Sequence, residues 1–212
     1  MYELFEKLDE AKRNLIIDCS IKEFTINGYH KASTNNIVKA ANISKGALFN
    51  YFGSKKNLFL YVLDYTTDYY VNYIIDNIGE SSPDLFQRIL QWTEFKIKIS
   101  MKNPLVYKFF ISAFLKSPEE LKNDLTKRYA KLYEKGVFLA LDGIDKSKFR
   151  TELDVDKSIE IILYSLNGVS EKNMGKVSSL EDSGLNSIEE RFEDIKKYIE
   201  VLRKAFYSKE FW

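Results

Sequence analysis

Five side chains in one short stretch of the sequence are of the types that contact DNA. Lys45 and Asn50 offer hydrogen-bond donors to base edges, and an asparagine amide can pair with adenine through two hydrogen bonds. Ser33 and Thr34 stand where a helix is expected to start, and their hydroxyl groups and free backbone N–H groups suit a phosphate oxygen. Lys55 repeats this arrangement at a later helix. The stretch therefore indicates both base reading and phosphate contacts.

Two short helices joined by a tight turn would position these side chains. The segment from Gly28 to Lys55 reads GYHKASTNNIVKAANISKGALFNYFGSK, with one helix expected after Thr34 and the other after Ser44. Asn42-Ile43 would make the turn between them. This is a helix-turn-helix, in which the second helix enters the major groove of DNA.

Small and apolar residues divide this segment into a reading face and a core. Gly46 and Ala47 leave room for the second helix to approach base edges. An amphipathic helix over about 9–25, ended by Asn27-Gly28, precedes the pair. The core of the small domain is predicted from apolar residues at helical spacing, namely Ile37, Val38, Ala40, Ala41, Ile43, Leu48 and Phe52.

Charge is distributed unevenly along the chain, although its formal net charge is only +1. From Phe24 through Leu63 there is no Asp or Glu. A locally positive potential of this kind favours a phosphate backbone through counterion release. An ordinary solvated face would also explain the charge pattern taken alone. The basic residues of the stretch are Lys31, Lys39, Lys45, Lys55, Lys56 and His30.

The segment resembles the N-terminal signature of the tetracycline-repressor (TetR) family. That signature has a glycine and an aromatic residue, a Thr or Ser pair, an isoleucine, an alanine-rich turn, Ser-Lys-Gly, aromatic residues and a lysine. The resemblance covers about residues 10 to 60, and the rest of the chain is similar only in length, helical content and order of segments. The matching residues are Gly28-Tyr29, Ser33-Thr34, Ile37, Ala40-Ala41, Ser44-Lys45-Gly46, Phe49, Tyr51-Phe52 and Lys55.

The resemblance implies a set of contacts with DNA. Phe49 stands where the family usually has tyrosine, so only ring packing against the sugar-phosphate backbone is expected there. Asn50 replaces the commoner histidine, so the operator of a relative cannot be assumed. Contacts in the groove or with base edges are implied for Asn35, Lys45, Gly46, Ala47 and Asn50. Phosphate contacts are implied for Thr34, Phe49, Tyr51 and Lys55.

The whole chain is predicted to be all-α. Its 212 residues include only three prolines and nine glycines, and 45% are hydrophobic. We expect a three-helix DNA-binding domain over residues 1–54 and a larger helical bundle for ligand binding and dimerisation over residues 55–212. Within the bundle, a loop is expected over 169–187. The predicted helices of the bundle cover about 55–78, 84–101, 104–115, 119–141, 155–168 and 188–207.

Aromatic residues are frequent in the bundle and allow a small-molecule pocket. They could simply pack its core, but buried tyrosine hydroxyl groups seek partners and can fix a ligand in an apolar cavity. Because they fall on helices that enclose the effector site in similar proteins, the candidates are Tyr65, Tyr69, Trp92, Phe95, Phe110, Phe114 and Tyr133.

Broad apolar stripes on the last two helices predict a homodimer. Two reading helices must reach half-sites about 34 to 36 Å apart, or a multiple of that distance, and a palindromic operator would mirror the symmetry of the dimer. The predicted interface residues are Ile161, Tyr164, Ser165, Ile195, Tyr198, Ile199 and Leu202.

These expectations combine into a ligand-responsive regulator. A small apolar or amphipathic effector that binds best when the DNA-reading helices of the two protomers are wrongly spaced would weaken DNA binding by linkage. The helix over 55–78 would transmit the change. Such a protein would be a cytoplasmic repressor that binds double-stranded DNA, a second copy of itself and an unknown effector.

Other classes of protein fit the sequence less well. One His, one Cys and the lack of metal-ligand clusters, phosphate loops and nucleophile motifs argue against an enzyme, a metal or a cofactor. No stretch is apolar enough for a membrane span. The alternative is a helical ligand- or protein-binding module without sequence-specific DNA binding.

Overall fold

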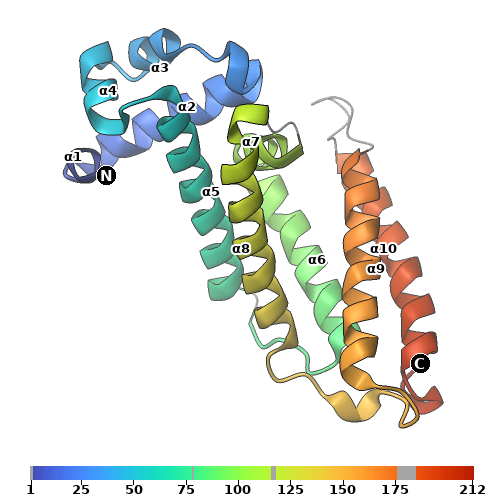
Figure 1. Cartoon of the computed structure of the whole chain (residues 1–212). Helices are drawn as coiled ribbons and strands as arrows, with labels where there is room; N and C mark the ends of the chain where they lie inside the picture. Colours follow the sequence, from blue (N-terminus) through green and yellow to red (C-terminus); the bar gives the residue numbers. More distant parts are fainter. Residues whose placement is uncertain (1, 78, 116–117, 176–184) are drawn as a thin grey trace. The chain divides into compact units, whose positions relative to one another are not determined.

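The computed structural model describes residues 2–77, 79–115, 118–175 and 185–212, and these residues form helices joined by short connections (Figure 1). They contain no β-strand, only an isolated bridge between Phe149 and Tyr207. The all-α prediction is therefore confirmed. Among these residues no helix combines the length and apolar character needed to cross a membrane. The helices are α1 (Glu3–Glu6), α2 (Glu10–Lys31), α3 (Thr34–Ala40), α4 (Lys45–Phe52), α5 (Lys55–Asn77), α6 (Leu85–Lys102), α7 (Pro104–Leu115), η1 (Glu119–Leu121), α8 (Lys122–Leu141), η2 (Lys146–Lys148), α9 (Val155–Gly175), α10 (Leu185–Phe206) and η3 (Lys209–Phe211).

Several helix ends differ from the prediction. The chain does break at Gly28, which adopts φ 64° and ψ 172° within the range of α2. By contrast, α9 continues past Gly168 to Gly175, because one glycine in a helix interior costs only about 1 kcal/mol and does not end it. The predicted loop over 169–187 was therefore too long at both ends, and residues 176–184 lie outside the described residues.

Packing divides the chain into two compact units. Unit 1 comprises Met1–Tyr73 and Asn103–Tyr129, and unit 2 comprises Ile74–Lys102 and Ala130–Trp212. Helices α5 and α8 each contribute residues to both units. The predicted boundary between residues 54 and 55 was drawn by function, between DNA binding and ligand binding, and it stays a prediction.

Unit 1 is built around aromatic rings from three helices. The rings of Phe24 on α2 and Phe59 on α5 meet edge to face with centroids 5.0 Å apart. Phe109 on α7 lies 5.5 Å from Phe59 and 6.2 Å from Phe24. Tilted and edge-to-face contacts of this kind are the favoured geometry for aromatic pairs. The three rings fix α7 to the helices that carry the helix-turn-helix.

Unit 2 has a core of its own, formed where α10 packs against α6 and α9 (Figure 1). The Tyr207 ring packs edge to face on Phe86 and Phe149, with centroids 4.8 and 4.9 Å away. The Tyr207 hydroxyl accepts a hydrogen bond from the backbone N–H of Leu85 at 3.2 Å. Burial raises the pKa of Tyr207 to about 12, so this hydroxyl stays neutral. The buried residues of this core are Leu85, Phe86, Phe149, Ile159, Ile162, Ile199 and Tyr207.

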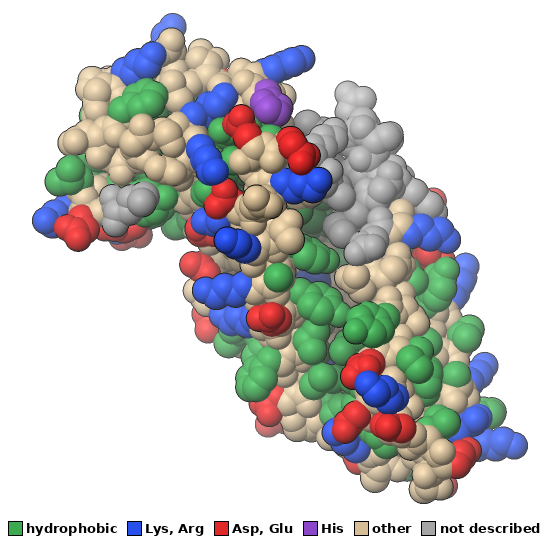
Figure 2. All heavy atoms as spheres, viewed as in Figure 1, with side chains coloured by type: hydrophobic (Ala, Val, Ile, Leu, Met, Phe, Trp, Pro, Cys, Tyr) green, Lys and Arg blue, Asp and Glu red, His purple; other side chains and the backbone are tan. Residues whose placement is uncertain are grey.

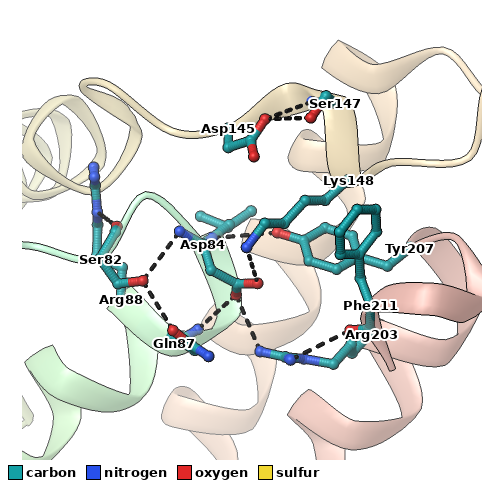
Figure 3. A network of polar contacts seen from close by, with 11 residues as sticks. Ser82, Asp84, Gln87, Arg88, Asp145, Ser147, Lys148, Arg203, Tyr207 and Phe211 are labelled. Carbon is teal, nitrogen blue, oxygen red and sulfur yellow. Dashed lines mark hydrogen bonds and ion pairs between the residues drawn. The ribbon is translucent and has the colours of Figure 1, made fainter.

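A buried carboxylate beside this core joins three segments of unit 2 (Figure 3). The side chain of Asp84 is 3% exposed and lies 3.0 Å from both Lys148 Nζ and Arg203 Nη2. Asp84 also accepts a hydrogen bond from the backbone N–H of Gln87 at 2.9 Å, which caps the start of α6. Two cations and a backbone donor thus compensate the desolvation of one charge.

Arg88, one turn later on α6, holds the neighbouring loops through backbone oxygens. Its Nε donates to the carbonyl oxygen of Ser82 at 2.7 Å. Its Nη1 donates to the carbonyl oxygens of Ala140 and Asp142, at the end of α8. The side chain therefore satisfies carbonyl groups that a helix end and a loop would otherwise leave unpaired.

Replacing Asp84 with alanine should destabilise the fold strongly. Asp84→Ala leaves Lys148 and Arg203 partly buried without a counter-charge, and we expect a loss of about 3 kcal/mol in the free energy of unfolding. Urea unfolding followed by circular dichroism measures this loss.

The matched control is Asp156→Ala, which removes an exposed ion pair with Lys146 of 2.7 Å. Its unfolding midpoint should stay in place, because solvent screens exposed pairs. Equal midpoints for Asp84→Ala and Asp156→Ala would contradict the structural role given to Asp84.

Candidate nucleic-acid interface

The core of the helix-turn-helix forms largely as predicted. The four residues Ile37, Ala41, Leu48 and Phe52 are buried, and Val38 and Ile43 are half-buried. Ala40 is exposed, so the prediction that it packs in the core was wrong. The reason is helical geometry, since a turn of 3.6 residues places position 40 to one side of the stripe made by positions 37, 38 and 41.

A lysine from α2 locks the turn between α3 and α4. The Nζ of Lys12 donates to the carbonyl oxygen of Ala41 at 3.0 Å and to that of Asn42 at 3.1 Å. Asn42 adopts a positive φ of 49°, a conformation that asparagine tolerates better than most residues. The ammonium group satisfies carbonyl oxygens at the negative end of the α3 dipole and fixes the turn predicted at Asn42-Ile43.

Two further side chains close the other helix ends of this region. Lys55 Nζ donates to the carbonyl oxygens of His30 and Ala32, at 3.1 and 3.3 Å, at the end of α2. The amide of Asn57 donates to the carbonyl oxygen of Phe52 at 2.9 Å, at the end of α4. Lys12 and Asn57 were missed from the sequence, because capping side chains lie on other helices than the ends they cap.

A short helix that the sequence did not predict supports the end of α4. Phe5 on α1 is fully buried, and its ring lies 4.7 Å from that of Phe52 and 5.9 Å from that of Tyr51. Tyr61 on α5 lies 5.2 Å from Phe5 and donates from its hydroxyl to Glu6 at 2.5 Å. The apolar pair Leu4-Phe5 was the only signal for α1, and it is too short to show helical periodicity.

The outward side of α4 carries the residues predicted to read bases. Lys45, Gly46, Phe49 and Asn50 are exposed, at positions one turn apart on the helix, whereas Ala47 is half-buried. Ser44 Oγ accepts a hydrogen bond from the N–H of Ala47 at 3.0 Å and caps the helix as predicted. A Cβ atom added to Gly46 would meet only Ser44 Oγ, at 3.9 Å. The protein's own packing therefore does not require glycine at this position.

Three of the four residues for which the resemblance implies phosphate contacts lie together. Thr34, Phe49 and Lys55 line one shallow depression, with Ser54 between the helices. Phe49 is 39% exposed, so its ring is available to pack against a sugar-phosphate backbone. The fourth residue, Tyr51, is half-buried beside Phe5 and Phe52. The phosphate contacts themselves stay predictions.

The start of α3 is occupied by an acidic side chain. Glu23 Oε1 accepts a hydrogen bond from the backbone N–H of Ser33 at 2.8 Å and lies 3.3 Å from the amide nitrogen of Asn36. The Ser33 side chain makes no capping hydrogen bond with α3. Ser33 could therefore reach a phosphate only through its hydroxyl group. Asn35, in the first turn of α3, is exposed.

The structure separates the lysines of this region by environment. Lys31, Lys39 and Lys45 are exposed and have no partner among the described residues. Lys56 instead pairs with Asp124 at 2.8 Å, and Lys55 is held by carbonyl oxygens. Figure 2 shows no acidic side chain over α3 and α4 on the face it presents. Three lysines are therefore free to set a positive potential beside α4.

The residues predicted for an effector pocket belong to both units. Tyr65, Tyr69, Phe110 and Phe114 are in unit 1, whereas Trp92, Phe95 and Tyr133 are in unit 2. Within unit 1 the Phe110 ring lies 5.3 Å from that of Phe114. Tyr65 is 40% exposed, and burial of part of its side chain, together with Asp18 and Glu10, raises its pKa. The pocket stays a prediction.

The residues predicted for a dimer interface differ in exposure. Ile161 and Tyr164 on α9 are 51% and 70% exposed, and Ser165 beside them is half-buried. Ile195, Tyr198 and Leu202 on α10 are half-buried, and Ile199 is part of the core of unit 2. Val201, which the prediction did not include, is 68% exposed. The interface stays a prediction.

Comparison with known proteins gives related regulators. A sequence model described as "Bacterial regulatory proteins, tetR family" matches residues 16–62. The uncharacterized HTH-type transcriptional regulator YuxN of Bacillus subtilis is 34% identical over 109 residues, which are 50% of this chain but only 35% of YuxN. The negative transcriptional regulator IcaR of the Staphylococcus aureus biofilm operon icaADBC is 27% identical over 129 residues, 58% of this chain and 69% of IcaR.

Solved structures share the fold along nearly the whole chain. A TetR family transcriptional regulator from Chloroflexus aurantiacus has a TM-score of 0.59 at 21% identity, covering 98% of both chains. The fatty acid degradation regulator FadR from Bacillus halodurans has a TM-score of 0.63 at 20% identity, covering 90% of this chain and 97% of that one. At these identities the likeness concerns the fold alone.

A leucine at position 46 should separate folding from DNA binding. Because the space outside Gly46 is open and leucine favours a helix more than glycine does, Gly46→Leu should unfold at the same temperature as the parent protein or higher. The new side chain would stand between α4 and base edges, so affinity for duplex DNA should fall by about tenfold or more. Thermal unfolding and fluorescence anisotropy with labelled duplex measure the two effects.

Gly46→Ala provides the graded control, with a stability equal to that of the parent or higher and a smaller loss of affinity. A leucine variant that binds DNA as tightly as the parent would place the DNA contact elsewhere than this face of α4.

Proposed function

This chain belongs to the TetR family of bacterial regulatory proteins, and from that premise we propose that it is a homodimeric repressor. The dimer would bind a palindromic operator, and a small effector would release it from that operator. The observation that carries this proposal is the outward side of α4, where Lys45, Gly46 and Asn50 are exposed. Side chains from α2 and α5 cap the ends of the helix-turn-helix and hold this face in place. A rigid, exposed reading helix is the arrangement that base recognition needs.

Electrostatics supports a duplex as the partner. Lys31 at the end of α2, Lys39 on α3 and Lys45 on α4 have no partners among the described residues, and no acidic residue occurs from Phe24 through Leu63. Each lysine that contacts a phosphate releases a counterion and contributes to affinity in a salt-dependent way. The same lysines attract DNA over the distance of a Debye length, about 8 to 10 Å at physiological salt.

Repression is the regulatory direction we propose. IcaR is a negative regulator, and the operator-bound dimer would act by blocking transcription, as the name of that relative indicates for its own operon. The exposed Ile161 and Tyr164 on α9 are the residues around which we expect the dimer interface to form. A dimer in the cytoplasm would present two α4 helices to the half-sites of a palindrome.

The contacts in unit 1 suggest how an effector signal would reach the reading helix. Asp64 on α5 receives a bidentate contact from Arg128 on α8, with distances of 2.6 and 2.8 Å. Lys56, at the start of α5, pairs with Asp124 on α8 at 2.8 Å. We therefore expect the first part of α5 to move together with the first part of α8 rather than alone. Tilting this pair would change the spacing of the two reading helices.

Selection of bound duplexes from a random pool tests the proposal. The purified protein should enrich a palindrome and bind it more tightly than random duplex by a factor of about 10³ to 10⁷. If no sequence is enriched, the alternative of a helical binding module without operator recognition takes its place.

The salt dependence of DNA binding then tests whether Lys45 contacts a phosphate and Lys56 does not. In Lys45→Ala, the slope of log affinity against log salt concentration should decrease by about one, because one phosphate contact is lost. Lys56→Ala serves as the control, since Lys56 is engaged with Asp124, and its slope should match that of the parent. A larger change in the Lys56 variant than in the Lys45 variant would refute this assignment of charges.

A further inference from the structure

An unpaired donor lies inside unit 2. The indole Nε1 of Trp92 on α6 is buried and has no hydrogen-bond partner among the described residues. Buried N–H groups are nearly always paired, because an unpaired one costs about 1 to 3 kcal/mol. Elsewhere in unit 2 the buried side chains of Asp84 and Arg88 make ion pairs or hydrogen bonds. The Trp92 N–H is therefore an exception, because it lacks a hydrogen-bond acceptor among the described residues.

Lys96 stands one turn further along α6, on the same face as Trp92. Residues four apart on a helix are neighbours, and this face continues to Ile99 and Ser100, both buried. Lys96 is nevertheless reached by solvent. Protein atoms also surround its ammonium group closely enough that desolvation lowers its pKa. The Lys96 ammonium group is therefore partly desolvated and lies within one helical turn of the Trp92 indole.

Nothing in the described part of the chain compensates the charge of Lys96. Its ammonium group makes no hydrogen bond or ion pair there. Lys98, two residues further along α6, is exposed too. Two residues on a helix are separated by about 200°, so Lys98 faces away from Trp92 and Lys96.

We propose that Trp92 and Lys96 bind the carboxylate of an amphipathic organic anion, and that this anion is the effector of the regulator proposed above, on which the inference rests. The ammonium group would neutralise the carboxylate, and the indole N–H would donate to one of its oxygens. One cation and one neutral donor match the single negative charge of a carboxylate better than they match the two negative charges of a phosphate dianion. The apolar neighbours Ile99 and Phe95 suit the hydrocarbon part of such a ligand.

The binding of carboxylates to the full chain can be followed at Trp92 itself. The sequence has two tryptophans, so in the Trp212→Phe background all indole fluorescence comes from Trp92. Hexanoate, octanoate and decanoate are titrated into this protein, with 1-octanol and octylammonium as the neutral and cationic counterparts. We expect saturable changes in emission with the carboxylates, and affinities for octanol and octylammonium at least about tenfold weaker.

Two lysine variants on α6 form the matched pair. Lys96→Met keeps a long apolar side chain without charge and should weaken octanoate binding by about tenfold or more. Lys98→Met should leave the octanoate affinity unchanged. Calorimetry of Trp92→Phe, which keeps an aromatic ring but loses the N–H, should show an intermediate loss. The proposal is overturned by absence of carboxylate binding, by equal affinity for octanol, or by full binding in Lys96→Met.

Operator binding is read separately, so that the two proposals can fail independently. Octanoate that binds at Trp92 should also release the selected palindrome, and Lys96→Met should bind the palindrome normally but resist release. Binding of the palindrome without carboxylate binding would reject the anion site and retain the regulator. Carboxylate binding by a protein that enriches no DNA would reject the regulator and its effector while retaining the anion site.

Discussion

The helix-turn-helix formed by α3 and α4 depends on hydrogen bonds to the carbonyl groups at its helix ends. Short helices such as α3 and α4 leave a large fraction of their carbonyl groups without intrahelical partners, and they are marginal on their own. Here Lys12, Lys55 and Asn57 donate to the carbonyl oxygens that end α3, α2 and α4. Each donor comes from a different helix than the end it caps. The caps therefore stabilise the helices and also fix the angles between them.

This arrangement gives Lys55 two possible roles that must be kept apart. The resemblance to relatives implies a phosphate contact, and Lys55 does line the depression shared with Thr34 and Phe49. Its Nζ is also bound to two carbonyl oxygens and lies 4.8 Å above the Tyr29 ring. Removing this lysine would disturb the end of α2 as well as any contact with DNA. Lys45, which has no such structural contact, reports on DNA more directly.

The sequence allowed good prediction of what depends on local pattern. The all-α class, the helix-turn-helix and the break at Gly28 follow from periodicity and turn residues. The caps could not be predicted, since Lys12 and Ala41 are 29 positions apart and meet only through the fold. Helix α1 was missed because four residues show no period. Ala40 was assigned to the core although its position on the helix lies outside the buried stripe. In the site, exposure of Lys45 and Asn50 was foreseeable, but the pairing of Lys56 with Asp124 was not.

The openness around Gly46 bears on how a regulator of this kind can evolve. The residues that hold the fold, such as Leu48 and Phe52, and those that face outward, such as Gly46 and Asn50, alternate along one helix, and a Cβ atom at position 46 would meet only Ser44. A substitution on the outward side therefore leaves the core packing intact. Gene duplication followed by change at these few positions could give copies that recognise new promoters while folding equally well. Selection for new DNA targets can then proceed without loss of stability.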